Sequence, residues 1–213
     1  MISIIIPLMP VEPWKTTVGD CIYSISKSVG AEYEVILQIQ EVEKYINKNK
    51  LLNDGFAKAK GDIIWHCDAD FLINETFLRR MEDALIGDLD LVYENGYDVI
   101  WPMFYSNFVK GYKASDGGPF MKREVLEKHG PLDESLIGIS LVTFPFMKWC
   151  LENVKHYAST DLTIELQPTG KFDQNKVDAK TFWKNVRTKQ AVVKTMKEFN
   201  YWGRQKHENC ACG

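Results

Sequence analysis

The sequence predicts an α/β protein, a three-layer sandwich in which helices cover both faces of a mainly parallel central sheet. Three observations favour this fold class. Short β-branched runs alternate with segments whose apolar residues recur at helical spacing. The first run, ISIII at 2–6, is apolar at nearly every position, as in a strand buried on both faces. The 213 residues are 45% hydrophobic, which suffices for a large core.

The first half of the chain repeats the order strand, helix, strand. Pro7 stops the first strand, and Gly30 and Gly61 follow the helical patterns as end signals. We therefore expect strands at 2–6, 32–40 and 62–68, and helices at 15–29 and about 47–60.

The second half continues the alternation. Asn74 can cap the next helix, and Pro145 must lie in the first turn of a later one or kink it. We expect helices at about 77–89, 122–129, 140–154 and 176–200, and strands at about 97–105 and 162–166. The domain prediction is a main domain at 1–175, with halves at about 1–105 and 106–175, and a C-terminal helical extension and tail at 176–213.

Composition excludes several functional classes. Lys plus Arg number 26 against 29 Asp plus Glu, so the net charge of −3 argues against nucleic-acid binding. The N-terminus lacks a basic region and a long apolar run, so we expect neither a signal peptide nor a transmembrane segment. Five cysteines without a CxxC pair suit free thiols in a reducing compartment. We expect a cytoplasmic protein, with further domains if the parent chain is longer.

Two carboxylates follow the third strand in the run IIWHCDADFL. Residues i and i+2 of a strand point to one side about 6.5–7 Å apart, so Asp68 and Asp70 should share a face at the strand's carboxyl end, where ligands bind in open α/β sheets. Two carboxylates this close repel each other unless a cation lies between them, and their oxygen atoms are ligands that Mg²⁺ or Mn²⁺ prefers. Such a metal ion could bridge the phosphates of a nucleotide. A solvated turn is the alternative. We expect His66 to be a hydrogen-bonded core histidine.

Three segments together resemble nucleotide-sugar glycosyltransferases of the GT-A fold, especially family 2-like enzymes. They are SIIIPLMP, LNDGFAKAKGDIIWHCDAD and GGPFMKREVLEKHGPLDES. The residues in register are Asn53, Gly55, Ala59, Gly61, Asp62, Asp68, Asp70, Gly117, Gly118, Arg123, Gly130, Asp133 and Glu134. The resemblance covers about residues 1–150. It implies a GT-A catalytic domain at 1–175, and the chain is also similar to glycosyltransferases of large algal viruses (chloroviruses), which implies the host cytoplasm.

The resemblance implies a set of ligand contacts. Pro7 and Leu8 would touch the nucleotide base, Asp68 the ribose or the metal, and Asp70 the metal. Asn53 would belong to the nucleotide site, and Asp116, Gly117 and Gly118 would approach the donor sugar, although SDGG is equally consistent with a plain turn. The family's second strand usually ends in an acidic residue that reads uracil, but this chain has Gln38 and Gln40 there, whose amides could still bind a pyrimidine. His156 would be a third metal ligand or, alternatively, an exposed histidine.

One departure from the family concerns the general base. The Glu-Asp pair of inverting enzymes should follow GPLDES, but the chain has LIGISLVTFPF there. Either Asp116, Asp133 or Glu134 replaces the base, or the enzyme retains configuration and the leaving phosphate accepts the proton. We expect retention.

The sequence therefore predicts a metal-dependent glycosyltransferase that moves a hexose from a UDP-sugar to a saccharide or glycoprotein acceptor, with Mn²⁺ or Mg²⁺ as cofactor. A haloacid-dehalogenase-like phosphatase, which also uses DxD after an apolar strand, is one alternative. That family places DxD on its first strand, whereas here it follows the third. A non-catalytic sugar-binding module is the other alternative. A nucleotidyltransferase is disfavoured because no Gly-rich basic loop follows the first strand.

Overall fold

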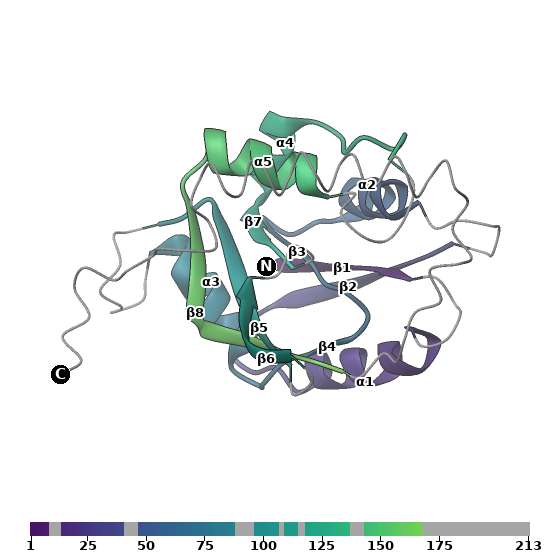
Figure 1. Cartoon of the computed structure of the whole chain (residues 1–213), viewed down its shortest axis with the longest axis vertical. Coiled ribbons are helices and arrows are strands. Elements are labelled where there is room, and N and C mark those ends of the chain that lie inside the picture. Colours follow the sequence, from purple (N-terminus) through teal and green to yellow (C-terminus); the bar gives the residue numbers. More distant parts are fainter. Residues whose placement is uncertain are drawn as a thin grey trace.

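An eight-stranded sheet forms the centre of the protein in a computed structural model, which describes residues 1–8, 14–40, 47–87, 96–106, 109–114, 118–136 and 143–167 (Figure 1). Its strands are β1 (Ile2–Leu8), β2 (Tyr33–Ile39), β3 (Ile63–His66), β4 (Phe71–Leu72), β5 (Val99–Ser106), β6 (Val109–Ala114), β7 (Phe120–Lys122) and β8 (His156–Leu166). The order across the sheet is β2-β1-β3-β7-β5-β8-β4, and β6 pairs with β5.

Most strands of this sheet run in one direction. β1 pairs in parallel with both β2 and β3, and β5 pairs in parallel with β8. β7 is antiparallel to β3 and to β5, so it joins the two parallel groups and leaves them with the same direction. β4 and β6 also run against their neighbours. The predicted mainly parallel α/β sheet is confirmed.

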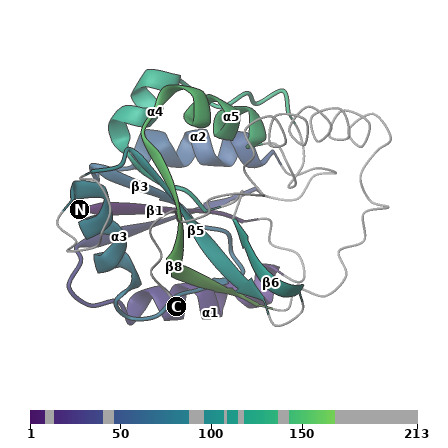
Figure 2. The ribbon, with the colours of Figure 1, turned by 60° about the vertical axis from the view of Figure 1, so that its left-hand side comes forward.

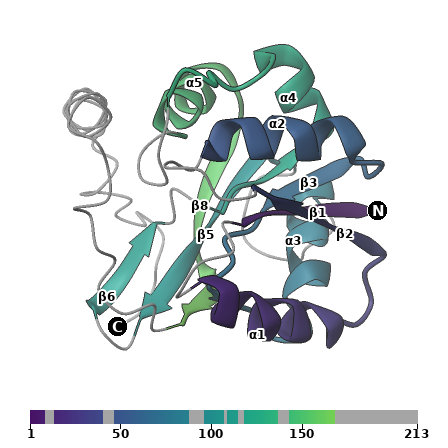
Figure 3. The same ribbon diagram turned by 90° about the vertical axis from the view of Figure 1, so that its right-hand side faces the viewer.

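Helices cover both faces of the sheet, as predicted (Figures 1 and 2). They are α1 (Trp14–Ser26), α2 (Lys48–Lys58), α3 (Phe77–Ile86), α4 (Arg123–His129) and α5 (Phe144–Asn153). Figure 3 shows α2, α4 and α5 on one side of the strands and α1 and α3 on the other. No helix within the described ranges combines the length and the hydrophobicity that crossing a bilayer requires.

The continuous apolar run of β1 is explained by two separate cores. Ile4 and Ile6 pack in the cluster that contains residues of α1 and α3, whereas Ile5 packs in the cluster that contains residues of α2 and α5. Successive side chains of a strand point to opposite faces, so the residues on both faces of β1 must be apolar here. Complete burial of one such side chain stabilises the fold by about 1.5–3 kcal/mol.

Several boundaries differ from the sequence prediction for physical reasons. α3 ends at Ile86 because Gly87 adopts a left-handed φ of 81° and its N–H bonds to Asp83 O. β8 begins at His156, earlier than the predicted 162, because its residues from His156 to Ser159 also pair with β5. The short antiparallel strands β6 and β7 carry no strong periodicity and were not predicted. Pro145 lies in the first turn of α5, as expected. The predicted helices at 176–200 lie outside the described residues.

Candidate active site

The carboxylate pair lies at the carboxyl end of β3, in the middle of the sheet. Cys67 continues the strand by donating its N–H to Ile5 O at 3.0 Å, and Phe71 N–H then closes a turn on Asp68 O at 3.2 Å. The N–H of Gln167, just after β8, donates to Asp70 O at 2.9 Å. The turn that carries the pair is therefore held between β1 and the end of β8.

Asp68 receives two donors on one oxygen. Lys48 Nζ lies 2.7 Å from Asp68 Oδ1, and His66 Nε2 lies 3.2 Å from the same atom. Burial alone would raise the pKa of Asp68, but the Lys48 charge and the His66 hydrogen bond outweigh it and leave this pKa below its ordinary value. Asp68 is therefore an ionised carboxylate.

Asp70 has the opposite electrostatic character. Burial, and secondly the charge of Asp68, raise the pKa of Asp70 to about 7. Lys48 favours the ionised form of Asp70 too weakly to offset these effects. The nearby positive charge is thus too small to keep Asp70 ionised, and a bound divalent cation would supply more.

Lys48 is the site residue that the sequence analysis missed. It is the first residue of α2, after the cap Asn47, and only 10% of its side chain is exposed. A positive charge is unfavourable at a helix N-terminus, and a buried ammonium needs a partner. Asp68 is that partner. In the sequence INKNK this lysine is indistinguishable from a solvated one.

The pair fits a divalent metal as a two-carboxylate site. Mg²⁺ is commonly held by one or two carboxylates and completed by phosphates and water. Among the described residues, no group of three or more His, Cys, Asp or Glu side chains could hold a metal ion. His156 does not join the pair: it begins β8 opposite Val99, whereas the other end of this 11-residue strand approaches Asp70. The expectation of a third ligand at His156 is therefore wrong for this structure.

Two buried thiols lie beneath the pair. Cys21 Sγ of α1 and Cys67 Sγ are 3.8 Å apart, and both lie within hydrogen-bonding distance of Asp68 O. Burial, and secondly the contact with Cys21, raise the pKa of Cys67 well above its ordinary value. Cys67 is thus a protonated, free thiol, and Cys21 and Cys150 are free thiols too.

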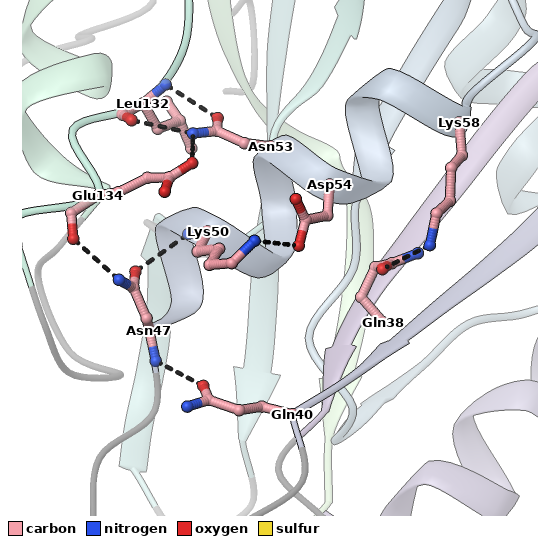
Figure 4. A network of polar contacts seen from close by, with 9 residues as sticks. All are labelled: Gln38, Gln40, Asn47, Lys50, Asn53, Asp54, Lys58, Leu132 and Glu134. Atoms are coloured by element: carbon pink, nitrogen blue, oxygen red, sulfur yellow. Dashed lines mark hydrogen bonds and ion pairs between the residues drawn. The ribbon is translucent and has the colours of Figure 1, made fainter. Parts of the chain in front are cut away.

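Three asparagines, the N-cap Asn47 and Asn49 and Asn53 of α2, hold the loop after α4, and we call this set the amide clasp. Asn47 Nδ2 donates to Glu134 O at 2.8 Å and Asn49 Nδ2 to Asp133 O at 2.9 Å. Asn53 Nδ2 donates to Leu132 O and to Glu134 Oε1, and Asn53 Oδ1 accepts the Leu132 N–H. Figure 4 shows Asn47 and Asn53 reaching this loop from one helix.

The clasp changes the interpretation of three predicted site residues. The amide of Asn53 is committed to the loop, so Asn53 holds protein rather than nucleotide. Glu134 is exposed, and one of its oxygens accepts from Asn53. Asp133 is exposed, and its Oδ1 accepts the Ser135 N–H at 2.9 Å. Because Lys48 lies between Asn47 and Asn49, the start of α2 connects this loop to Asp68.

The remaining predicted contacts lie at neighbouring strand ends. Pro7 of β1 is opposite Gln38 of β2, and the Leu8 carbonyl accepts the Gln40 N–H. The side-chain oxygen of Gln38 accepts from Lys58 Nζ at 3.1 Å (Figure 4). Gly118 is buried next to Pro119, whose carbonyl accepts the His66 N–H. The structure brings Gly118 to the edge of β3, whereas Asp116 and Gly117 lie outside the described residues.

Packing accounts for the glycines of the family-like motif. A Cβ at Gly55 would collide with Ile5 Cγ2 of β1, and one at Gly61 would lie 2.6 Å from Met1 O. Arg123 fastens the same turn, because its guanidinium donates to the carbonyls of Ala59 and Gly61. These positions hold α2 against the sheet and so place the clasp.

Solved structures with a similar architecture include a mannosyltransferase and complexes with UDP, UDP-GlcNAc and GDP-Man. S. aureus TarS 1–349 matches 92% of this chain over 65% of its own length, with 14% identity and a TM-score of 0.61, and it has also been solved with UDP and UDP-GlcNAc. Mannosyltransferase PcManGT of Pyrobaculum calidifontis, in complex with GDP-Man and Mn²⁺, matches 95% of this chain over 65% of its own, with 13% identity and a TM-score of 0.56.

Glucosyl-3-phosphoglycerate synthase of Mycobacterium tuberculosis, in complex with phosphoglyceric acid, matches 92% of this chain over 79% of its own, with 14% identity and a TM-score of 0.57. At these identities the likeness establishes the fold, which is GT-A. The chain spans 65% of TarS 1–349 and 44% of a longer TarS structure. Neither a protein-family model nor a curated protein matches the sequence.

Proposed function

We propose that the protein is a divalent-metal-dependent glycosyltransferase that transfers a hexose from a nucleoside diphosphate sugar, specifically a UDP-sugar, to a saccharide acceptor. The observation that carries the proposal is the carboxylate pair at the end of β3, in which Asp68 is ionised and Asp70 lacks positive charge. The GT-A fold supports it, because structures of this fold hold UDP, UDP-GlcNAc, or GDP-Man with Mn²⁺.

Each site residue has a role toward one part of the metal and nucleotide-sugar complex. Asp70, together with Asp68, would hold Mn²⁺ or Mg²⁺, which neutralises charge on a diphosphate leaving group when bound. Lys48 keeps Asp68 ionised and places a second positive charge at the same point. The adjacent ends of β1 and β2, at Pro7, Leu8 and Gln38, would receive the base, and Gly118 would approach the sugar.

We infer that the transfer retains configuration. The acceptor oxygen forms a bond to C1 of the hexose on the face from which the diphosphate departs, and the acceptor proton passes to the leaving diphosphate. Support comes from the missing carboxylates in the segment LIGISL and from the engagement of Glu134 with Asn53. The anomer of the product, determined by NMR, tests this inference, and an inverted anomer overturns it.

Ligand-dependent thermal stability tests the proposed function. We expect UDP and Mn²⁺ together to raise the Tm, because a ligand at 100 times its Kd stabilises the fold by about 2.7 kcal/mol. Asp70→Ala should abolish this shift, whereas Asp54→Ala should keep it, because Asp54 pairs with Lys50 on the exposed surface of α2. The absence of any UDP effect on the wild type would refute the proposal.

Hydrolysis of UDP-sugars then separates the enzyme from a pure binding module. We expect slow Mn²⁺-dependent release of UDP from one member of a panel of UDP-hexoses, and its loss in Asp70→Ala. Binding without any turnover would favour the sugar-binding module. Hydrolysis of a simple phosphomonoester without a UDP effect would favour the phosphatase.

A further inference from the structure

His66 occupies an unusual place for a polar side chain. It is the last residue of β3 and is 2% exposed. On one side its ring lines a pocket together with apolar side chains, among them Leu52, Trp101 and Phe146. On the other side its Nε2 meets Asp68 Oδ1 at 3.2 Å. An ionised carboxylate can only accept hydrogen bonds, so Nε2 carries the hydrogen.

Both hydrogen-bond donors of Asp68 contact the same carboxylate oxygen. Lys48 Nζ and His66 Nε2 both bond to Oδ1, and among the described residues none donates to Oδ2. Rotation of the carboxylate away from this arrangement would break two charge-assisted hydrogen bonds. The two donors therefore fix the carboxylate and leave Oδ2 as the oxygen that a ligand can use.

Burial of a histidine at this point has a cost that packing alone does not offset. Removing a polar group from water costs about 1–3 kcal/mol in proteins unless it is hydrogen-bonded. The preceding residues Ile64 and Trp65 are apolar, and an apolar residue would fill the same space beside the pocket. The bond to Asp68 is the feature of the site that requires an imidazole.

We propose that His66 is a positioning residue, which orients Asp68 so that Oδ2 faces the metal-nucleotide complex. The proposal rests on the proposed function, because it assigns a role toward the same ligand. Hydrogen-bond partners of metal-binding carboxylates act in this way, and their loss typically lowers metal affinity by about 10- to 100-fold.

Three substitutions separate positioning from packing. In His66→Gln, an amide nitrogen reaches about as far as Nε2 and can still donate to Asp68. In His66→Asn, the amide is polar but too short. His66→Leu preserves bulk without a donor. His129→Leu is the matched control, since His129 at the end of α4 packs against Phe146 and Trp149 of α5.

The measurements are the affinity for UDP with Mn²⁺ by calorimetry and the Mn²⁺ electron paramagnetic resonance signal, both on the whole protein. We expect about a 10- to 100-fold weaker affinity in His66→Asn and His66→Leu, and near wild-type affinity in His66→Gln and His129→Leu. If His66→Leu does not fold, the Asn and Gln pair still decides.

The outcomes distinguish the two proposals. A wild type that binds no UDP with Mn²⁺ refutes the proposed function itself. If the wild type binds UDP with Mn²⁺ and the Asn, Gln and Leu variants bind it with the wild-type affinity, the positioning role of His66 is overturned and the proposed function is not. A reduced Tm with unchanged affinity would also overturn it, because a merely structural histidine behaves in that way.

Discussion

At the scale of single residues, the two carboxylates differ although one alanine separates them. Asp68 has two donors on one oxygen, whereas Asp70 is half-buried beside a negative charge. Their environments push their pKa values apart. Without a metal, the negative charge of Asp68 is compensated by its donors, whereas that of Asp70 is not. Removing the charge should therefore destabilise the folded protein at Asp68 and stabilise it at Asp70.

Asp70→Asn should stabilise the metal-free protein at alkaline pH. The folded pKa of Asp70, about 7, lies above its unfolded value of about 3.9, so its contribution to stability is present below pH 4 and is lost as the pH rises through 7. Asn removes this loss, and at pH 8 we expect a gain on the order of 1–2 kcal/mol. Urea unfolding with a chelator at pH 5 and pH 8 measures it.

The comparison is made as a difference between the variant and the wild type, because His66 contributes its own pH dependence in both proteins. Burial, and secondly the charge of Lys48, lower the pKa of His66, so its contribution to stability is lost as the pH falls. An equal pH dependence in the variant and the wild type would show that Asp70 is not the strained group.

Lys48→Met should separate metal binding from nucleotide binding. Loss of the ammonium removes a positive charge beside the metal site while His66 still donates to Asp68 Oδ1, so the affinity for Mn²⁺ alone should rise. The affinity for UDP in the presence of Mn²⁺ should fall, because a positive charge at the diphosphate is lost. Calorimetric titrations with Mn²⁺ and then with UDP measure both. Lys50→Met, which removes an exposed partner of Asp54 on the same helix, should change neither affinity.

At the scale of elements, α2 organises the site more than any strand does. Its first residue, Lys48, pairs with Asp68. Its N-cap and first turns hold the loop at 132–134 through hydrogen bonds. Gly55, which has no Cβ, lets the helix pack closely against β1. One helix therefore sets the distance between the carboxylate pair and the loop that bears Glu134. A rigid helix is a precise support for such an arrangement, because its side chains are fixed by packing.

Asn53→Ala should loosen the loop after α4. It removes two donors and one acceptor from contacts with Leu132 and Glu134, and we expect a loss of about 1–3 kcal/mol of stability. Hydrogen exchange at the Leu132 amide should accelerate. Asn153→Ala is the control, because the Asn153 amide donates only to Trp149 O of its own helix. Unchanged protection of Leu132 would contradict the clasp.

At the scale of the whole molecule, what could be predicted from the sequence follows from the range of the interactions. The β3 strand and its carboxylates are adjacent in the chain, so a local pattern predicted them. Asn53 and Leu132 are 79 residues apart, and no local pattern couples them. Lys48 looked like a surface lysine. The family resemblance suggested His156 as a ligand, but its position depends on the order of the strands across the sheet, which no local pattern gives.

The glycines of the two helices test how α2 is joined to the sheet. Gly55→Ala should destabilise the protein, because its Cβ would collide with Ile5 Cγ2 and lie 3.4 Å from Gln38 Cγ, which forces α2 away from β1 and β2. Overpacking of this kind costs about 1–3 kcal/mol. Displacement of α2 should also weaken UDP binding with Mn²⁺, because Lys48 and the clasp move with the helix.

Gly19→Ala is the matched substitution in α1. A Cβ at Gly19 meets nothing within 4 Å, so only the helical preference for alanine acts, and we expect a gain of about 0.5–1 kcal/mol with unchanged UDP affinity. Urea unfolding of both variants gives the two signs. A Gly55→Ala protein as stable as Gly19→Ala would mean that α2 can shift on the sheet at no cost, and the close packing that places Lys48 beside Asp68 would then not determine the site.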